Sequence, residues 1–200
     1  MRRDSQRLKS ACVFCGSSDA ADPAFLTAAA ALGKGLADAG IKLVYGGGGV
    51  GLMGAVARAA HMAGGEVLGV IPTFLVGKER ALEMVEHIIV DNMHERKMLM
   101  FQRADSFVIL PGGIGTLEEV VELLSWRRLD LHAKPVVFYN PRNFWAPLFA
   151  LFQHTVDENL TPAEFMSAWM SVETIDEVIP ALLDHGREPY PSEAAVGRRG

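Results

Sequence analysis

Two glycine-rich segments constrain the fold of this chain more than any other feature of its sequence. Gly48–Gly51 follows the apolar run Leu43–Tyr45, Gly112–Gly115 follows the apolar run Phe107–Leu110, and a helical pattern begins at each. A glycine-rich turn between a strand and a helix points backbone N–H groups and the positive helix end at an anion. Each segment is also compatible with a tight turn that needs glycine only for close packing. Two such segments favour one phosphate-bearing ligand that bridges both.

Short apolar runs alternate with amphipathic stretches along the chain. Continuously apolar runs are typical of strands that are buried on both faces of a parallel sheet. The alternation predicts a doubly wound, Rossmann-like α/β fold with a mostly parallel sheet and helices on both faces, which binds ligands beyond the carboxyl ends of its strands. Strands are expected over Ala11–Cys15, Ile41–Tyr45, Glu66–Ile71, His87–Val90, Ser106–Leu110, Pro135–Tyr139 and Trp169–Val172. Helices are expected over Pro23–Ala39, Gly51–Ala63, Met93–Ala104, Thr116–Arg128, Phe144–Glu158 and Ile175–His185.

Composition and charge exclude several classes of protein. The 200 residues are 50% hydrophobic and 22% charged, unlike a disordered chain. A formal net charge of −5 argues against nucleic acid as a partner. The longest stretch without a charged residue, Leu43–Ala57, is glycine-rich and too short to span a membrane. No apolar run precedes the first expected strand, so we expect a cytoplasmic protein without a signal peptide.

The length of the chain suits a single domain. We expect an N-terminal arm over residues 1–10, the folded domain over residues 11–185, and a mobile tail over residues 186–200. Cys12 and Cys15 have C-x-x-C spacing but lie in an expected strand, where residues three apart face opposite sides. A redox pair would open a helix and a zinc site would need a second pair, so we expect two buried, reduced thiols and no metal.

Two common nucleotide-binding motifs are absent or incomplete. Gly49–Gly54 matches G-x-G-x-x-G, but the next strand ends at Ile71 and Pro72 without the acidic residue that holds a ribose hydroxyl in NAD-binding proteins. The sequence contains no G-x-x-x-x-G-K-[ST] motif. We therefore disfavour NAD binding and exclude a Walker-type ATPase.

The segment Pro111–Glu119 carries the strongest functional signal. Its glycines let the backbone approach a phosphate, Thr116 adds a hydroxyl, and Glu119 follows one turn later. Thr116 and Glu119 also have the spacing of a capping box, in which Glu119 only bonds the Thr116 backbone N–H. The pattern alone favours the capping box over a carboxylate beside a phosphorylated sugar.

A second signal lies at the start of the helix expected from Met93. Asn92 suits the cap of this helix, with Glu95 three residues later. Arg96 and Lys97 place positive charge in the first turn, which the helix macrodipole disfavours. Such a locally unfavourable choice indicates an anion-binding site.

Together, P-G-G-x-G-T-x-x-E at Pro111–Glu119 and the R-K pair at Arg96 and Lys97 resemble the signature of the LOG ("lonely guy") phosphoribohydrolases. Further matches are C-V-F-C-G-S-S at 12–18, L-V-Y-G-G-G at 43–48, G-L-M-G at 51–54 and M-H-E-R-K at 93–97. The resemblance extends from Ala11 to His185. It implies a Rossmann-type homodimer without a cofactor. Such an enzyme hydrolyses a cytokinin riboside 5′-monophosphate to the N6-modified adenine and ribose 5-phosphate, and bacterial relatives often accept AMP.

The resemblance also implies roles for individual residues. The catalytic pair of the family falls on Arg96 and Glu119. The residues that would bind the substrate are Gly112, Gly113, Ile114, Gly115 and Thr116 around the 5′-phosphate, together with Glu79, Lys97 and Ser125. Candidates for further contacts with phosphate or ribose are Gly16, Ser17, Gly47, Gly48, Gly49 and Met53.

The chemistry of the reaction suits these residue types. Cleavage of a ribosyl C–N bond passes through an oxocarbenium-like state, which a carboxylate near C1′ stabilises while it takes a proton from the attacking water. Glu119 is the candidate for this carboxylate. The pKa of an arginine is too high for a general acid, so Arg96 is expected to orient Glu119 and to balance charge.

Two other functions are alternatives to this one. The glycine loops would also serve a protein that only binds or carries a phosphorylated ligand, as a molybdenum-cofactor carrier of related fold does, although the presence of both Glu119 and Arg96 argues against it. The family has sometimes carried the label of lysine decarboxylase. A pyridoxal enzyme needs a Schiff-base lysine and a partner for the ring nitrogen, and the sequence offers no such constellation.

Overall fold

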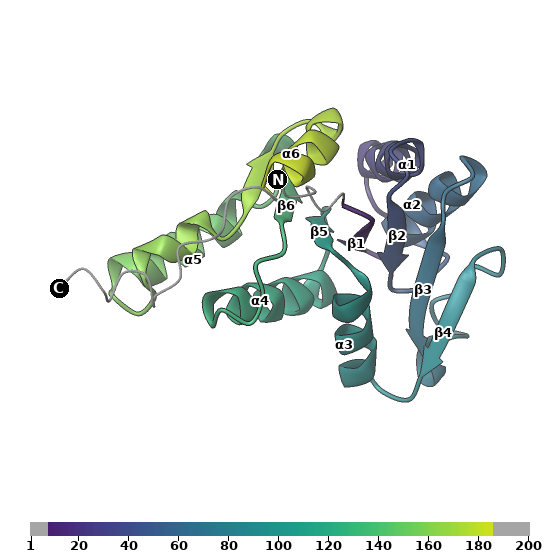
Figure 1. The fold of residues 1–200 in the computed structure, drawn as a ribbon, viewed down its shortest axis with the longest axis horizontal. Helices are drawn as coiled ribbons and strands as arrows, with labels where there is room; N and C mark the ends of the chain where they lie inside the picture. Colours follow the sequence, from purple (N-terminus) through teal and green to yellow (C-terminus); the bar gives the residue numbers. More distant parts are fainter. Residues whose placement is uncertain (1–7, 186–200) are drawn as a thin grey trace, which may run out of the picture. The chain divides into compact units, whose positions relative to one another are not determined.

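The computed structural model describes residues 8–185 (Figure 1). The expected tail and the first seven residues of the expected arm lie outside this range, and Ser10 already belongs to the first strand. The chain divides into two compact units. The first comprises the residues up to Val13 and Ser17–Ser106, and the second comprises Phe14–Gly16 and the residues from Phe107 onward.

The first unit is built on parallel strands in the order β4-β3-β2-β1. These strands are β1 (Ser10–Phe14), β2 (Lys42–Tyr45), β3 (Val67–Pro72) and β4 (Glu86–Val90). Its helices are α1 (Pro23–Asp38), α2 (Gly51–Met62), α3 (Met93–Arg103) and the short 3₁₀ helix η1 (Thr73–Leu75).

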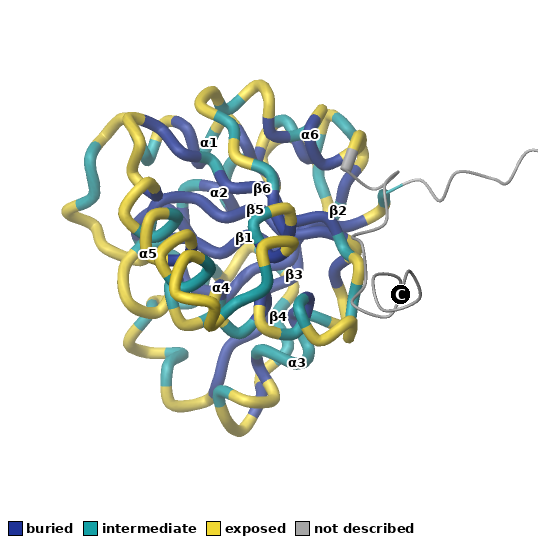
Figure 2. Tube along the Cα trace, turned by 90° about the vertical axis from the view of Figure 1, so that its left-hand side faces the viewer, coloured by how far each residue is buried: buried dark blue, intermediate teal, exposed yellow. Residues whose placement is uncertain are grey.

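Helices pack against the inner strands of the first unit. Every residue of β3 is buried, and both α2 and α3 contact this strand. Figure 2 shows β2 and β3 as buried tubes. α1 lies close against α2 because residue 33 is glycine: a β-carbon at Gly33 would lie 2.1 Å from the Val56 carbonyl oxygen.

The second unit holds the parallel strands β5 (Ser106–Ile109), β6 (Val136–Tyr139) and β7 (Met170–Val172) in that order, although Ser106 itself counts with the first unit. Its helices are α4 (Ile114–Arg128), α5 (Ala146–Asp157), α6 (Val178–His185) and the 3₁₀ helices η2 (Pro141–Asn143), η3 (Ala163–Ser167) and η4 (Ile175–Glu177). Aromatic rings form much of the core: Phe138 meets Trp145, Phe149 and Trp169 edge-on at centroid distances of 5.6, 5.1 and 6.1 Å. Such edge-to-face contacts favour a fixed packing of large rings.

The predicted doubly wound α/β fold with parallel strands is confirmed. Every expected strand and helix is present, with shifted ends. α5 begins at Ala146 rather than at Phe144 because η2 precedes it, with Arg142 in the left-handed region (φ 52°). Among the described residues, no helix is long and apolar enough to cross a membrane.

Candidate functional site

The start of α4 in the second unit forms an open glycine-rich turn. Gly113 is the N-cap in an extended conformation, and no side chain bonds to this helix end. β-Carbons at Gly113 and Gly115 would meet no atom within 4 Å, and the Ile114 side chain is 84% exposed. The first N–H groups of a helix lack partners within the helix, so this turn can receive an anion.

Thr116 and Gly112 fit together inside this turn. Thr116 is buried, and a β-carbon at Gly112 would lie 2.2 Å from its Oγ1 atom. Within the same unit, the Gly16 N–H donates to the Pro111 carbonyl oxygen at the beginning of this turn, at 3.1 Å. Glycine at position 112 is therefore required for the threonine hydroxyl to lie against the turn.

The capping box predicted from Thr116 and Glu119 is wrong. α4 begins at Ile114, which places Thr116 inside the helix, and Gly113 takes the cap position instead. The glycine at 113 allows this earlier start because the helix can begin without a side-chain cap. The half-buried Glu119 carboxylate therefore does not have the capping role that the pattern favoured.

Cys15 is the buried neighbour of Glu119 within the second unit. Burial raises the pKa of the Cys15 thiol far above its ordinary range, and the negative charge of Glu119 raises it further. Cys12 and Cys15 are both buried and unbridged, as predicted, although Cys15 lies just after β1 rather than within it. The thiol is thus an uncharged group next to the carboxylate, without nucleophilic character.

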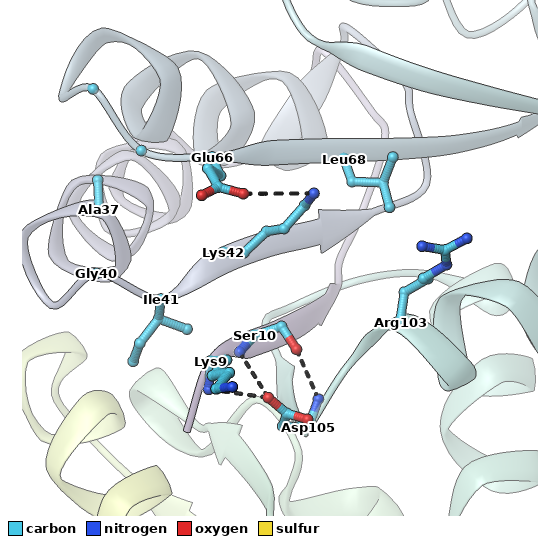
Figure 3. A pocket seen from close by; sticks show the side chains of 12 residues that line it. Lys9, Ser10, Ala37, Gly40, Ile41, Lys42, Glu66, Leu68, Arg103 and Asp105 are labelled. Carbon is cyan, nitrogen blue, oxygen red and sulfur yellow. Dashed lines mark hydrogen bonds and ion pairs between the residues drawn. The ribbon is translucent and has the colours of Figure 1, made fainter. Parts of the chain in front are cut away.

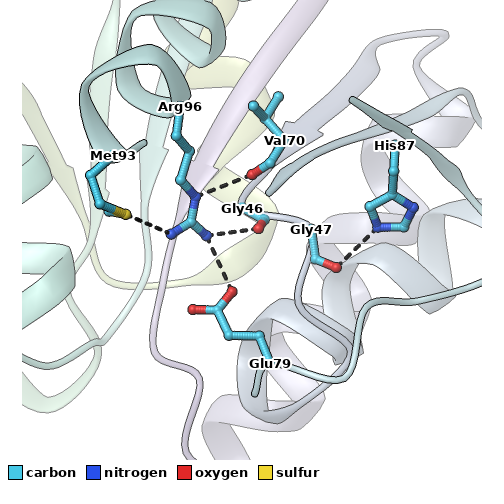
Figure 4. Close-up of polar contacts among 7 residues, drawn as sticks. All are labelled: Gly46, Gly47, Val70, Glu79, His87, Met93 and Arg96. Carbon is cyan, nitrogen blue, oxygen red and sulfur yellow. Dashed lines mark hydrogen bonds and ion pairs between the residues drawn. The ribbon is translucent and has the colours of Figure 1, made fainter. Parts of the chain in front are cut away.

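Arg96 in the first unit points inward from the first turn of α3. Asn92 caps this helix as predicted, accepting a hydrogen bond from the Glu95 N–H at 2.9 Å. Arg96 is 5% exposed, and its Nε and Nη2 atoms donate to the carbonyl oxygens of Val70 and Gly46 at 3.1 and 2.7 Å (Figure 4). The guanidinium is therefore fixed at the ends of β2 and β3 rather than solvated.

Glu79 supplies the counter-charge for Arg96. Its Oε2 atom lies 3.3 Å from Arg96 Nη2. Burial raises the pKa of the Glu79 carboxyl, while the charge and the hydrogen bond of Arg96 lower it; the net direction is upward. The remaining guanidinium nitrogen, Nη1, faces the weak acceptor Met93 Sδ at 3.8 Å.

The glycine segment after β2 lies against this pair. Gly47 adopts φ +82°, and a β-carbon at Gly48 would lie 2.8 Å from Met53 Cε and 3.3 Å from Glu79 Oε2. The Gly49 N–H donates to the Glu79 carbonyl oxygen at 2.9 Å. The structure thus brings together the predicted residues of this loop with Glu79 and Arg96.

The start of α2 differs from the start of α4. The Asp19 carboxylate accepts a hydrogen bond from the Gly51 N–H at 3.2 Å and is paired with Arg80. These two contacts lower the pKa of Asp19 despite some desolvation. The protein's own anion therefore takes the position that the sequence suggested for a ligand phosphate, which argues against a phosphate that bridges both glycine segments.

Three further predicted residues lie at half-buried or exposed positions. Lys97 is half-buried on α3, and Ser17 is exposed. Ser125 is also exposed, and its place on α4 puts it about 120° around the helix axis from Glu119. Sequence reasoning missed Asp19 and the role of Arg58, whose Nη1 atom donates to the Gly49 carbonyl oxygen at 2.8 Å. Neither had a local motif to mark it.

A cavity of about 640 Å³ lies elsewhere in the first unit, near the amino ends of the strands (Figure 3). Lys9, Lys42 and Arg103 contribute positive charge to its lining. Helices α1, α2 and α3 end beside it, and cations complement the negative ends of helices. The positive charges of the lining are therefore explained by the helix ends. None of the predicted site residues lines this cavity. Across residues 8–185, no cluster of histidine, cysteine, aspartate and glutamate could hold a metal ion.

The fold and the P-G-G-x-G-T turn place the chain in the class of doubly wound α/β proteins with a glycine-rich turn at a helix N-terminus. Residues 53–182 match the sequence family described as "Possible lysine decarboxylase". The chain is 44% identical over 180 residues to the probable cytokinin riboside 5'-monophosphate phosphoribohydrolase LOGL9 of Oryza sativa subsp. japonica, covering 90% of this chain and 79% of the relative. It is 40% identical over 189 residues to the cytokinin riboside 5'-monophosphate phosphoribohydrolase LOG7 of Arabidopsis thaliana, covering 94% and 87%. The chain belongs to the LOG family of cytokinin riboside 5'-monophosphate phosphoribohydrolases.

Solved structures with a similar fold include two molybdenum-cofactor proteins. The molybdenum cofactor carrier protein from Chlamydomonas reinhardtii has a TM-score of 0.66 at 22% identity, with 91% of this chain and 100% of that chain covered. The molybdenum cofactor binding protein from Rippkaea orientalis has a TM-score of 0.65 at 22% identity, with 90% and 98% covered. At such identities the likeness shows the fold alone.

Proposed function

We propose that this protein hydrolyses the N-glycosidic bond of cytokinin riboside 5′-monophosphates, releasing the N6-modified adenine and ribose 5-phosphate. AMP is the second candidate substrate. The observation that carries the proposal is the open turn at the start of α4, with a carboxylate one turn later, in a chain that belongs to the LOG family.

We assign the 5′-phosphate to the α4 turn. β-Carbons at Gly113 and Gly115 would meet no atom within 4 Å, and Thr116 packs against Gly112, where it contributes its hydroxyl. The helix macrodipole adds attraction for the phosphate charge. The start of α2 is not assigned to a phosphate because Asp19 already bonds there.

In the proposed reaction, a water oxygen bonds to C1′ as the C1′–N bond breaks. Glu119 stabilises the positive charge that develops on the ribose and accepts a proton from the water. The base leaves with the electron pair of the broken bond and takes up a proton. The family pattern assigns Arg96 to balancing the negative charge of the substrate; it stays charged and is held within its own unit by Gly46, Val70 and Glu79. Lys97, Glu79 and Ser125 are assigned to substrate binding by the family pattern.

Glu119→Gln tests this assignment. The variant keeps the length and helix preference of the side chain, and Glu119 does not cap the helix. The melting temperature should therefore stay close to that of the wild type. Release of free base from N6-isopentenyl-AMP should fall by about 100-fold or more. Glu118→Gln, one residue earlier and exposed, is the matched control. Unchanged hydrolysis in Glu119→Gln rejects the catalytic role.

A non-catalytic carrier of a phosphorylated ligand is the second candidate, favoured only by the fold shared with the molybdenum-cofactor proteins. Incubation of the wild type with AMP and N6-isopentenyl-AMP separates the two functions. A carrier would bind nucleotide without releasing base. An enzyme would release base from at least one of them, without added cofactor.

We also propose that the protein is a cytoplasmic homodimer and that residues 11–185 fold as one domain. Exposed apolar side chains support the dimer: Ile114 and Val121, two turns apart on α4, are 84% and 48% exposed. Buried, unbridged cysteines suit a reducing compartment. Light scattering should give twice the chain mass for the wild type and one chain mass for Val121→Glu, and thermal unfolding should occur in one transition.

A further inference from the structure

His87 makes contacts that no predicted role explains. It lies on β4, and each of its ring nitrogens is 3.0 Å from a carbonyl oxygen: Nδ1 from that of Val85 and Nε2 from that of Gly47. A carbonyl oxygen only accepts hydrogen bonds, so the neutral ring donates to Gly47 when the proton is on Nε2 and to Val85 when it is on Nδ1. Figure 4 shows the imidazole reaching toward the loop that follows β2.

Two glycines create the space for this ring. A β-carbon at Gly69, on the intervening strand β3, would lie 2.6 Å from His87 Cδ2, and one at Gly47 would lie 3.2 Å from the same atom. Any side chain at position 69 would therefore displace the imidazole. The reach of His87 across β3 depends on the absence of both side chains.

The loop held by His87 is also the loop that holds Arg96. Gly46, the residue before Gly47, accepts a hydrogen bond from Arg96 Nη2 at 2.7 Å, and the same nitrogen lies 3.3 Å from Glu79 Oε2. Two consecutive carbonyl groups are thus bound by two different side chains. The Gly47 carbonyl also accepts the Leu82 N–H, but at 3.4 Å, so the contact with His87 at 3.0 Å is the closer of the two.

We propose that His87 is a positioning residue: by binding the Gly47 carbonyl it fixes the direction of the Gly46 carbonyl and, through it, the guanidinium of Arg96. His87 itself touches no substrate in this scheme. The expected effect of His87 on catalysis rests on the proposed function. The restraint that His87 places on the Gly46–Gly47 loop does not depend on that function.

Three variants test the proposal by their kcat/KM for base release from N6-isopentenyl-AMP. His87→Phe keeps a flat ring without an N–H and should lower kcat/KM by about tenfold, as expected for one lost hydrogen bond. His87→Gln keeps an N–H donor and should recover most of this loss. Ile89→Ala, at an exposed position on the same face of β4, is the control and should match the wild type. If His87→Phe does not fold, His87→Leu, which also lacks an N–H, takes its place.

A double-mutant cycle distinguishes positioning from general support of the fold. In an Arg96→Lys background, His87→Phe should cause little further loss, because the group that it positions is already gone. Equal losses in both backgrounds, or wild-type kinetics of His87→Phe, would overturn the proposal. Hydrogen exchange at the Gly46–Gly48 amides gives a readout without catalysis: it should accelerate in His87→Phe and not in Ile89→Ala. If the wild type releases no base, the proposed function fails, and this exchange measurement still decides the role of His87.

Discussion

Arg96 and Glu79 form an ion pair in the interior of the first unit, with side chains that are 6% and 19% exposed. The pair Lys34–Asp38, in contrast, lies on the surface with side chains more than half exposed. Burial outweighs the attraction of Arg96 in setting the pKa of Glu79, so the ionised carboxylate is held at a cost to folding. Such a pair contributes little net stability, so its main effect is the fixed arrangement of charge that it provides.

Arg96→Lys should weaken both the fold and the reaction. A lysine ammonium cannot reach Val70, Gly46 and Glu79 together, since it lacks the planar fork of the guanidinium. We expect a loss of about 1–3 kcal/mol in the free energy of unfolding and a fall of about 100-fold or more in kcat/KM. Urea denaturation and base release measure the two effects. Arg103→Lys, exposed at the end of the same helix, should change neither; an unchanged urea midpoint in Arg96→Lys would contradict the prediction.

Gly112→Ala should damage the α4 turn. The new β-carbon would lie 2.2 Å from Thr116 Oγ1, so either the threonine or the turn must move. We expect a destabilisation of about 1–3 kcal/mol and weaker binding of AMP, measured by calorimetry on the folded protein. Gly77→Ala is the control, because a β-carbon there would meet nothing within 4 Å. Wild-type affinity in Gly112→Ala would exclude the turn as the phosphate site.

Asp19→Asn should destabilise the start of α2. The carboxylate accepts the Gly51 N–H and pairs with Arg80, and both contacts lower the pKa of Asp19. A group with a lowered pKa stabilises the fold above its unfolded pKa, and this stability is lost as the pH falls through its folded pKa. The melting temperature of the variant should therefore be lower than that of the wild type at pH 7, and the two should converge in acid. A constant difference across this range would show that the charge of Asp19 is unimportant.

His132 should make the second unit sensitive to mild acid. Burial is the main cause that lowers the pKa of His132; the Lys134 N–H donates to its Nδ1 atom at 3.2 Å, which requires that nitrogen to be unprotonated. The neutral ring is favoured in the folded state, so stability is complete above the unfolded pKa of about 6.5 and is lost as the pH falls toward the folded value. Urea midpoints between pH 8 and pH 5 should decline in the wild type and less steeply in His132→Asn. The exposed His61 gives the control: His61→Asn should follow the wild type.

The elements of the fold were predictable because their signals are local. Continuously apolar runs such as Val67–Pro72 marked buried strands, and glycine-rich turns marked the junctions with helices. The cap at Asn92 was also found, since its partner Glu95 lies three residues away. The same local reasoning failed at α4, where Thr116 and Glu119 have the spacing of a capping box but Gly113 begins the helix earlier.

The arrangement around the candidate site was less predictable because its contacts join residues that are far apart in the sequence. Arg96 bonds to a carbonyl group 50 residues away at Gly46, and Asp19 reaches an amide 32 residues away at Gly51. No spacing rule covers such pairs. Glu79 entered the prediction only through the family resemblance, and the structure then placed it against Arg96.

The contact between Asp19 and Gly51 has a consequence for the reuse of this fold. The glycine-rich starts of α2 and α4 have similar sequences but opposite chemical character. At α2 a carboxylate of the chain itself neutralises the electropositive helix end, whereas at α4 no side chain caps the helix. Replacing Asp19 and Arg80 by small neutral residues would be the first step in engineering an anion-binding site at the start of α2. Adding an acidic residue before α4 would block anion binding at the start of that helix. A glycine pattern alone therefore locates a potential anion-binding helix start, but it does not show whether a side chain of the protein already occupies that position.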